Sequence, residues 1–313
     1  MPKSVHPQIE KALAALAKAN LPALHTLTAP QARAQMEAMT AARGGEPTAV
    51  AHTLDRKIPG PAGEIPVRIY WPAEGGTRGA LVYYHGGGFV KGSPQSSDTT
   101  GWGLAMDSRA VCVSVDYRLA PEHKYPTPFH DCYGPLAHIA ANGPEYGVDA
   151  GRLAVAGDSA GGNLAAAVAL KARDTGGPAL RAQALIYPCL TDDLSAPSFA
   201  YNANPPGLST QSMGNYWNWY LGEDMVSEDP YATPLKALNL ANLPPAMILT
   251  AEYDPLYCDG VEYAARLRAA GVPVHYHCGH RLIHGFMRAR LKGQRSAAAF
   301  AAMTGFLRER FRV

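Results

Sequence analysis

A serine between two spaced glycines is the first candidate for chemistry in this chain. Gly157 and Gly161 lie two residues before and two residues after Ser159. An apolar run typical of a strand precedes the serine and an alanine-rich run typical of a helix follows it, so the pattern predicts a tight strand-to-helix corner. Such a nucleophile elbow exposes the serine hydroxyl beside the unpaired N–H groups of a helix start. The alternative, a structural turn of small residues, stays open because the chain has 31 glycines.

A second glycine-rich segment favours the catalytic interpretation. An apolar strand pattern runs into His85 and then into three consecutive glycines at positions 86–88. Glycines let backbone N–H groups point into a cavity, where they stabilise the oxyanion that forms during acyl transfer. We therefore predict an oxyanion hole from the N–H groups of Gly87, Gly88 and Ala160. His85 is interpreted as a structural residue whose ring fixes this loop.

These segments carry a family resemblance. The chain resembles bacterial esterases of the hormone-sensitive-lipase-like family, the GDSAG branch of the α/β-hydrolases, and the matching segments span residues 85 to 286 in the family's order. They are His85-Gly86-Gly87-Gly88-Phe89-Val90, Asp116-Tyr117-Arg118-Leu119-Ala120-Pro121-Glu122, Gly157-Asp158-Ser159-Ala160-Gly161-Gly162, Asp254-Pro255-Leu256 and His284-Gly285-Phe286. The resemblance implies an α/β-hydrolase fold, a serine esterase activity and a cap over the active site.

The general base must come from one of four histidines near the end of the chain. His275 and His277 alternate within a predicted strand and do not readily reach the end of the sheet. His280 and His284 therefore remain as candidates for the base. The His-Gly-Phe segment that matches the family implies His284.

The acid that orients this base should lie just past the end of a strand. Asp254 follows the predicted strand 246–251, whereas Asp259 falls within the next predicted helix and Glu252 is a weaker competitor. The resulting order of serine, acid and histidine is the one expected of α/β-hydrolases.

Strand and helix patterns alternate through most of the chain, which predicts an α/β-hydrolase fold: a mostly parallel central sheet flanked by helices, with a helical cap. We expect residues 46–194 and 241–313 to form the catalytic core. Two amphipathic patterns within residues 1–45 are assigned to the cap on the resemblance, with packing against the core as the alternative. Residues 195–240 lose the alternation, are rich in aromatic residues and are predicted to be the second part of the cap.

The substrate pocket is predicted from apolar residues of both cap segments and of the core. An aromatic stripe within 213–220 offers Trp217 and Tyr220, although such a stripe is more often part of a core than of a ligand wall. The resemblance adds Met36, an adaptable apolar residue of the first cap segment. The candidate substrate-binding residues are Met36, Tyr187, Leu208, Trp217, Tyr220 and Phe286.

Several other polar residues are expected to be structural. Asp116, Arg118 and Glu122 could be mistaken for an acid–base set, but the resemblance places them behind the nucleophile, so we favour an ion-pair network. Asp158 is interpreted as a hydrogen-bond acceptor that fixes the loop, and Cys258 as a structural thiol.

Composition excludes some classes of function. Charged residues make up 17% of the chain and the formal net charge is +2 without a basic cluster, so a nucleic-acid partner is not expected. The five cysteines are scattered and lack a CxxC pair, which favours free thiols and a cytoplasmic location over disulfides or a zinc site. The N-terminal segment has no uninterrupted apolar stretch for a signal peptide or membrane span. No metal or cofactor is expected, and a homodimer is plausible from the resemblance alone.

The sequence thus predicts a carboxylesterase for short- to medium-chain esters, with Ser159 as nucleophile, His284 as base and Asp254 as the orienting acid. Cleavage of an amide, lactone or carbamate by the same residues stays open. A non-catalytic receptor, like the plant gibberellin receptors that resemble this family, is the alternative from another class, and the complete set of catalytic residues argues against it. A peptidase of the prolyl-oligopeptidase kind would need a propeller domain for which the chain has no residues left.

Overall fold

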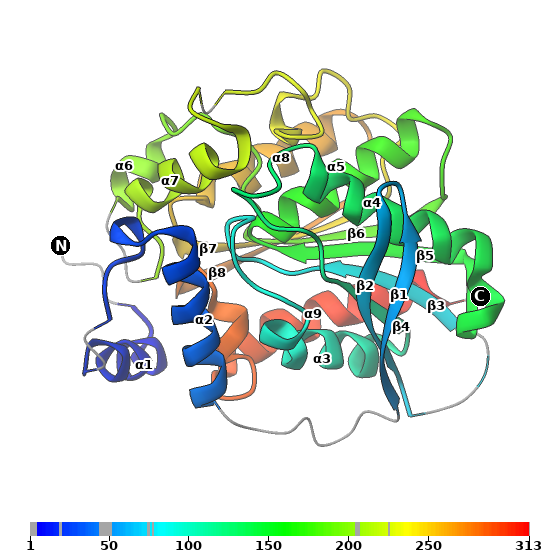
Figure 1. Cartoon of the computed structure of the whole chain (residues 1–313), viewed down its shortest axis with the longest axis horizontal. Helices are drawn as coiled ribbons and strands as arrows, with labels where there is room; N and C mark the ends of the chain where they lie inside the picture. The colour runs from blue at the N-terminus through cyan, green and yellow to red at the C-terminus, as the bar shows by residue number, and fades with distance from the viewer. Residues whose placement is uncertain are drawn as a thin grey trace.

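The computed structural model describes residues 5–18, 21–43, 52–73, 76, 78–203, 207–224 and 226–312. Their strands form one eight-stranded sheet in the order β1-β2-β4-β3-β5-β6-β7-β8 (Figure 1). The strands are β1 (His52–Gly60), β2 (Gly63–Trp71), β3 (Arg78–Tyr84), β4 (Val111–Val115), β5 (Val148–Asp158), β6 (Leu180–Ile186), β7 (Ala246–Tyr253) and β8 (Val274–Ile283).

The sheet is mostly parallel, as predicted. Strand β2 pairs antiparallel with β1 and with β4, and all other neighbours pair parallel. The α-helices are α1 (Pro7–Lys18), α2 (Ala29–Arg43), α3 (Asp98–Ser108), α4 (Thr127–Asn142), α5 (Ala160–Asp174), α6 (Pro197–Tyr201), α7 (Thr210–Leu221), α8 (Tyr257–Ala269) and α9 (Gln294–Arg310). Short 3₁₀ helices are η1 (Leu24–Thr26), η2 (Gln95–Ser97), η3 (Gly143–Tyr146), η4 (Pro234–Lys236) and η5 (Phe286–Ala289).

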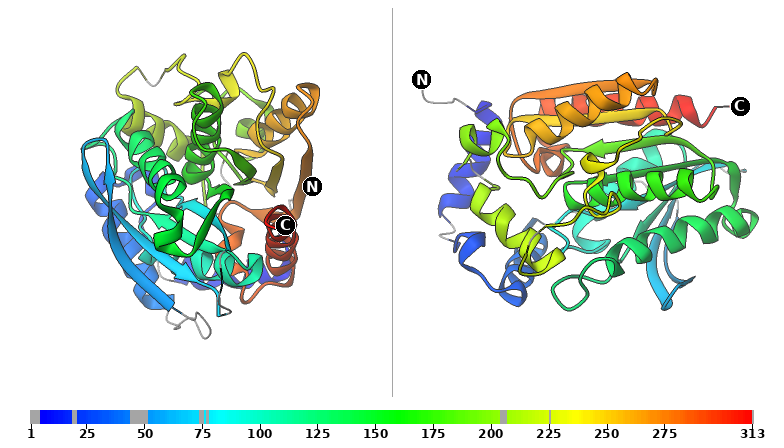
Figure 2. Two further views of the ribbon diagram at one scale, coloured as in Figure 1. Left: turned by 90° about the vertical axis from the view of Figure 1, so that its right-hand side faces the viewer. Right: turned by 90° about the horizontal axis from the view of Figure 1, so that it is seen from above.

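Helices cover both faces of the sheet. Alternate residues of a strand point to opposite faces, so Val82 and Tyr84 join the cluster with α4, α5 and α8, while Leu81 and Tyr83 join the cluster with α3 and α9. Figure 2 shows the two helical layers on either side of the sheet. Because both faces are buried, the central strands are continuous apolar runs, which is why they were visible in the sequence.

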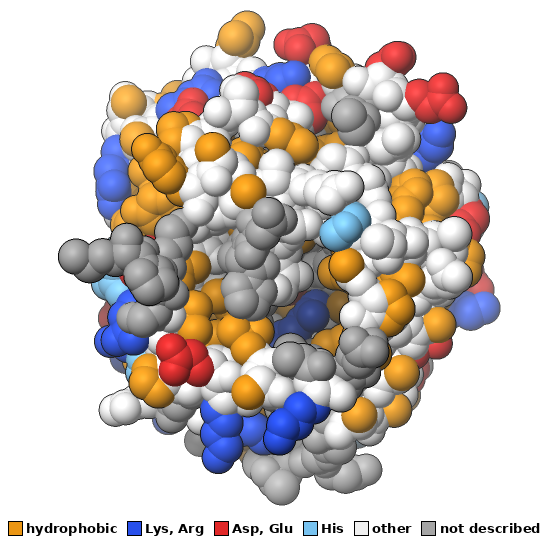
Figure 3. All heavy atoms as spheres, turned by 90° about the vertical axis from the view of Figure 1, so that its left-hand side faces the viewer, with side chains coloured by type: hydrophobic (Ala, Val, Ile, Leu, Met, Phe, Trp, Pro, Cys, Tyr) orange, Lys and Arg blue, Asp and Glu red, His pale blue; other side chains and the backbone are white. Residues whose placement is uncertain are grey.

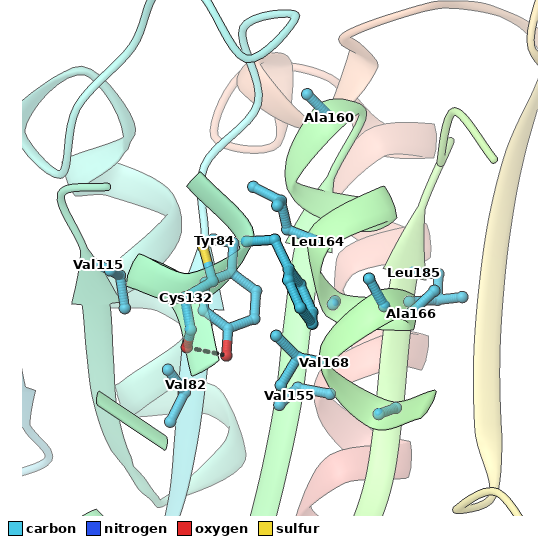
Figure 4. Packing of buried hydrophobic residues seen from close by; sticks show 14 of the residues in the cluster. Val82, Tyr84, Val115, Cys132, Val155, Ala160, Leu164, Ala166, Val168 and Leu185 are labelled. Carbon is cyan, nitrogen blue, oxygen red and sulfur yellow. Dashed lines mark hydrogen bonds between the residues drawn. The ribbon is translucent and has the colours of Figure 1, made fainter. Parts of the chain in front are cut away.

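Helix α5 is the centre of one layer. Its buried residues Leu164 and Val168 pack with Val155 and Leu185 of the strands below (Figure 4). In the same cluster the hydroxyl of Tyr84 donates a hydrogen bond of 3.0 Å to the backbone oxygen of Cys132. This packing fixes the start of α5, and therefore Ser159, relative to the ends of β3 and β5.

Helices α1, α2, α6 and α7 gather at one end of the sheet, far from the C-terminus (Figure 1). The N-terminal segment, with α1, η1 and α2, touches the segment with α6 and α7: Asn215 of α7 donates a hydrogen bond of 3.0 Å to the backbone oxygen of His25 in η1. Among the described residues, α1 ends at Lys18 and η1 begins at Leu24. Strand β1 begins at His52, and residues 44–51 lie outside the described part of the chain.

Candidate active site

The nucleophile elbow has the backbone that its glycines allow. Ser159 links β5 to α5 with φ 58° and ψ −119°, a conformation that L-residues rarely adopt. A Cβ atom on Gly157 would lie 2.0 Å from the backbone oxygen of Gly161, and one on Gly161 would lie 1.9 Å from that of Tyr84. No side chain fits at either position, so the two glycines are a steric requirement of the corner.

Three residues from three separate segments meet in a hydrogen-bonded chain. His284 Nε2 lies 2.9 Å from Ser159 Oγ, and His284 Nδ1 lies 2.7 Å from Asp254 Oδ2. Asp254 is fully buried, and its Oδ1 accepts a 2.9 Å hydrogen bond from the Leu256 N–H. A carboxylate oxygen that accepts from Nδ1 favours the tautomer with the proton on Nδ1, which leaves Nε2 free to accept the serine proton.

The competing residues lie elsewhere. His280 is exposed and lies 3.6 Å from Glu252, and His275 packs against the Phe306 ring. Strand β8 extends to Ile283, so His280 belongs to the strand and not to the loop after it. Asp259 is buried in α8, where its Oδ2 accepts a hydrogen bond from the Leu190 N–H and burial raises its pKa to about 8.

The loop at residues 85–91, called the oxyanion loop here, lies between the elbow and α7. Gly87 has φ 140° and Gly88 has φ 64°, both in the region that favours glycine. A Cβ atom on Gly87 would lie 1.9 Å from the Lys91 backbone oxygen, and one on Gly88 would lie 2.3 Å from the Tyr216 ring. No described residue accepts a hydrogen bond from the N–H of Gly87 or Gly88. Both donors, with Ala160 N–H at the start of α5, are therefore available to a ligand.

Two buried side chains hold this loop, as the sequence predicted. Asp158 Oδ1 accepts hydrogen bonds from the Tyr83 hydroxyl at 2.6 Å and from the Gly86 N–H at 2.8 Å. The His85 ring stacks on Tyr117 at 4.3 Å, and its Nδ1 lies 3.1 Å from the Gly86 oxygen. Burial lowers the pKa of His85 to about 4, so this histidine is neutral and serves as a support.

The predicted pocket residues separate into two groups. Tyr187 lies beside His284, with ring centroids 4.7 Å apart, and Phe286 packs edge-on against Tyr187 at 5.2 Å. Leu208 is buried just before α7, and Met36 is half-buried on α2. Tyr220 instead stacks on Phe89 at 3.7 Å, and Trp217 packs near the same ring at 5.6 Å. Trp217 and Tyr220 support the oxyanion loop from behind, and a direct contact with substrate stays a prediction for all six.

Two of the three residues expected to belong to a structural ion-pair network, Arg118 and Glu122, form ion pairs. Arg118 pairs with Asp131 at 2.8 Å, and Glu122 pairs with Arg33 of α2. Among the described residues, Asp116 forms an ion pair with neither Arg118 nor Arg33, and burial raises its pKa. The three residues are structural, as expected, but their partners come from distant elements, which the local sequence does not reveal.

The sequence interpretation missed three residues around the oxyanion loop. Tyr216 packs on Gly88, and Lys91 places its ammonium 5.5 Å from the centroid of the Tyr216 ring. Arg288, four residues after His284, lies near enough for its charge to act on Lys91. Lys91 follows the glycine-rich motif closely in the sequence, and this position could have indicated that it lies near the oxyanion loop.

Other sequence expectations concern the chain as a whole. The five cysteines are free thiols, as predicted. In the described part of the chain, no group of three or more His, Cys, Asp or Glu residues is placed to hold a metal ion. None of the described helices is long and apolar enough to span a bilayer.

Comparison with known proteins identifies the family. A family model described as "alpha/beta hydrolase fold" matches residues 81–288. The esterase LipI of Mycobacterium tuberculosis is 46% identical over 238 residues, which are 75% of this chain and 74% of that protein. An ethyl acetate hydrolase of Pseudomonas putida is 35% identical over 274 residues, 85% of each protein. The crystal structure of a thermostable esterase from Pseudomonas putida superposes with a TM-score of 0.95 at 33% identity, covering 100% of this chain and 99% of that one.

The chain therefore belongs to the hormone-sensitive-lipase-like α/β-hydrolases, and the prediction of a carboxylic ester hydrolase is confirmed. The face on which α1, α2, α6 and α7 gather is hollowed, and the hollow is lined by hydrophobic side chains with a Lys or Arg side chain inside it (Figure 3). A concave apolar site with a few polar groups is the usual form of a small-molecule pocket.

Proposed function

We propose that this protein hydrolyses short- to medium-chain carboxylic esters through an acyl-enzyme on Ser159, with His284 as general base and acid and Asp254 as the orienting carboxylate. The observation that carries the proposal is the hydrogen-bonded chain from Ser159 Oγ through both ring nitrogens of His284 to Asp254. A serine hydroxyl becomes an effective nucleophile only when an adjacent base accepts its proton.

The reaction proceeds in two halves. Ser159 Oγ bonds to the ester carbonyl carbon while His284 Nε2 takes the serine proton, and the carbonyl oxygen becomes an anion. The N–H groups of Gly87, Gly88 and Ala160 stabilise that anion, each by about 3 to 4 kcal/mol in the transition state. The intermediate collapses, the bond to the alcohol breaks, and His284 protonates the leaving oxygen. Water then attacks the acyl group in the same way and releases the acid and Ser159.

The substrate range follows from the cap. Residues 1–45 and 195–240 are proposed to close over the site, which favours small esters over interfacial triglyceride. The similarity to an ethyl acetate hydrolase supports short acyl chains. Hydrolysis of amides or lactones is the alternative on the same residues, and no contact in the site favours it.

Initial rates on p-nitrophenyl esters from acetate to palmitate test the proposal. We expect activity to peak at short to medium chains, and Ser159→Ala and His284→Ala to lower kcat by about 10⁴-fold or more. His280→Ala is the matched control, because His280 is an exposed histidine of the adjacent strand and should retain wild-type activity. A folded wild type that is inert on every ester, or equal losses in both histidine variants, would refute the assignment.

The cellular setting belongs to the same proposal. A cytoplasmic location is supported by the five free thiols. A homodimer is supported by the position of β8 at the edge of the described sheet, where its outer hydrogen-bonding groups can pair with a second copy. Light scattering of the purified protein measures the oligomeric state directly, and a monomer at micromolar concentration would contradict the dimer.

A further inference from the structure

Lys91 is a buried cation without a counter-charge. Its side chain keeps only 7% of its surface exposed, and its Nζ lies over the Tyr216 ring at 5.5 Å from the centroid. No described carboxylate forms an ion pair with it, and no described acceptor receives a hydrogen bond from its Nζ. Burying an unpaired ammonium is costly, and the face of the aromatic ring offsets only part of that cost.

The position of Lys91 connects it to the catalytic site. Its backbone N–H donates to the Gly87 oxygen, and its side chain runs against Gly87, since a Cβ atom there would lie 3.2 Å from Lys91 Cγ. The ring over which its ammonium lies is the one that packs on Gly88. The cation therefore lies along the two glycines assigned to the oxyanion hole.

Arg288 adds a second positive charge from the other side of the site. It lies on η5, directly after the catalytic histidine, and its side chain is exposed without an ion pair to a described residue. Burial raises the pKa of Tyr187 and of Tyr216, and the charge of Arg288 opposes that rise in both. Its field thus reaches the rings around both the catalytic histidine and the oxyanion loop.

The neighbouring acids are bonded to other groups. Asp158 is bonded to Tyr83 and Gly86, and Asp254 to His284 and the Leu256 N–H. Arg33 of α2 approaches the same loop through the Val90 oxygen, but its charge is paired with Glu122. Among the described residues, neither carboxylate forms an ion pair with Lys91 or Arg288, so both cations are available to an anionic ligand, and a basic side chain lies inside the hollow in Figure 3.

We propose that Lys91 and Arg288 form a subsite for a carboxylate carried by the ester, so that this protein favours half-esters of dicarboxylic acids and related anionic esters over neutral esters of the same shape. The inference rests on the proposed function. The carboxylate of the substrate supplies the partner that the buried ammonium lacks. A charge pair is strongest where both groups are shielded from water. Lys91 and Arg288 are specificity-determining residues here, and the bond-breaking steps stay with the catalytic residues.

The test compares mono-p-nitrophenyl glutarate with its neutral methyl ester, methyl p-nitrophenyl glutarate, as the ratio of their kcat/KM values. We expect the wild type to favour the charged ester, and Lys91→Met to lower the ratio by about 10- to 100-fold. Arg288→Gln should lower it by a smaller factor because that side chain is exposed. Lys171→Met is the matched control, since Lys171 also lies over a tyrosine ring, Tyr231 at 5.4 Å, on the far part of α5.

The pH dependence of the same ratio gives a second readout. Burial, with the charge of Arg288, lowers the pKa of Lys91 to about 7. The cation is therefore present below that pH and lost above it, so the wild-type ratio should fall between pH 6 and pH 9 and stay flat in Lys91→Met. The tyrosine and the histidine that face Lys91 do not change charge in this range: Tyr216 stays neutral because burial raises its pKa, and His85 is already neutral because burial lowers its pKa to about 4.

The outcomes separate this inference from the proposed function. A wild-type ratio near or below one, or equal losses on both esters in Lys91→Met, overturns the carboxylate subsite while esterase activity stands. No hydrolysis of either ester by folded wild type overturns the proposed function itself. If Lys91→Met fails to fold, the wild-type ratio and the exposed Arg288→Gln variant still decide the question.

Discussion

The oxyanion loop is held from two sides, and the two sides hold it in different ways. On the elbow side, contacts join backbone to backbone, and a Cβ atom on Gly161 would meet the oxygens of Tyr84 and His85 at 1.9 and 2.8 Å. On the α7 side, aromatic rings pack against the loop, with Tyr216 on Gly88 and Tyr220 stacked on Phe89. Backbone atoms cannot move without moving a strand, whereas a ring can shift or be replaced. Substitutions on the elbow side should therefore be strongly destabilising, whereas the aromatic side chains on the α7 side should shift to accommodate substitutions there.

The largest effect is expected from Gly161→Ala. The added methyl group overlaps backbone oxygens of β3 and of the oxyanion loop, so we expect a loss of more than about 4 kcal/mol of stability or no folded protein. Gly305→Ala in α9 is the control, because its Cβ atom would meet nothing within 4 Å. That variant should be unchanged or up to about 1 kcal/mol more stable in thermal unfolding. Similar melting temperatures for the two variants would remove the basis of the comparison.

Gly88→Ala tests whether the α7 side adapts. The new methyl group would lie 2.3 Å from the Tyr216 ring, and φ 64° adds about 1 to 2 kcal/mol of strain. We expect kcat to fall by about 10²-fold, since the loop that carries the N–H donors must shift. Adding Tyr216→Ala removes the overlap and should recover part of kcat, as measured in a double-mutant cycle. Additive losses in that cycle would show that the ring is not the obstacle.

Tyr83→Phe should have an intermediate effect. The substitution removes the hydroxyl that donates to buried Asp158 at 2.6 Å and leaves that carboxylate with the Gly86 N–H. An under-satisfied buried acceptor costs about 1 to 3 kcal/mol, measured by denaturant unfolding. A neutral result would mean that Asp158 holds the loop without its tyrosine partner.

The ion pair between Arg33 and Glu122 attaches α2 to the core near the oxyanion loop. Its hydrogen bonds with Arg33 lower the pKa of Glu122 to about 2, so its contribution to stability is complete above about pH 4.5 and is lost as pH falls towards 2. Because Glu122 is half-exposed, the stability difference between wild type and Glu122→Gln should be at most about 1 kcal/mol. Thermal unfolding at pH 7 and pH 3 measures this. If the stability difference between wild type and Glu122→Gln were larger at pH 3 than at pH 7, the expected pH dependence would be wrong.

The smallest effect is expected from Tyr220→Phe. The Tyr220 hydroxyl is buried and has no hydrogen-bond partner in the described part of the chain, so its removal exposes no other polar group. Stability should stay within about 0.5 kcal/mol of wild type or rise. Compared with Tyr83→Phe, the same chemical change then gives opposite outcomes on the two sides of the loop. A large loss of stability in Tyr220→Phe would show that this hydroxyl has a hydrogen-bond partner.

Much of the core was predictable because its signals are local. The buried strands are continuous apolar runs, the elbow requires glycine at both flanks, and the helix after it is rich in alanine. The end of β8 was misjudged, since residues 278–283 lack a clear apolar alternation and form a strand only because β7 offers a partner. In the same way Arg118 and Glu122 were recognised as structural, but their partners Asp131 and Arg33 come from other elements.

What the sequence alone determined is the chemistry: a serine at a corner that only glycines permit, a glycine-rich donor loop, and an acid and a histidine in the order of α/β-hydrolases. These patterns are readable because steric and backbone constraints act within a few residues. What only the tertiary structure decided is which side chains face one another across the sheet end. Tyr220 stacks on Phe89 behind the oxyanion loop, and Lys91 lies beside Tyr216 without a carboxylate partner among the described residues. Such side-chain contacts depend on packing between elements that lie more than a hundred residues apart in the sequence, and no local sequence pattern encodes them.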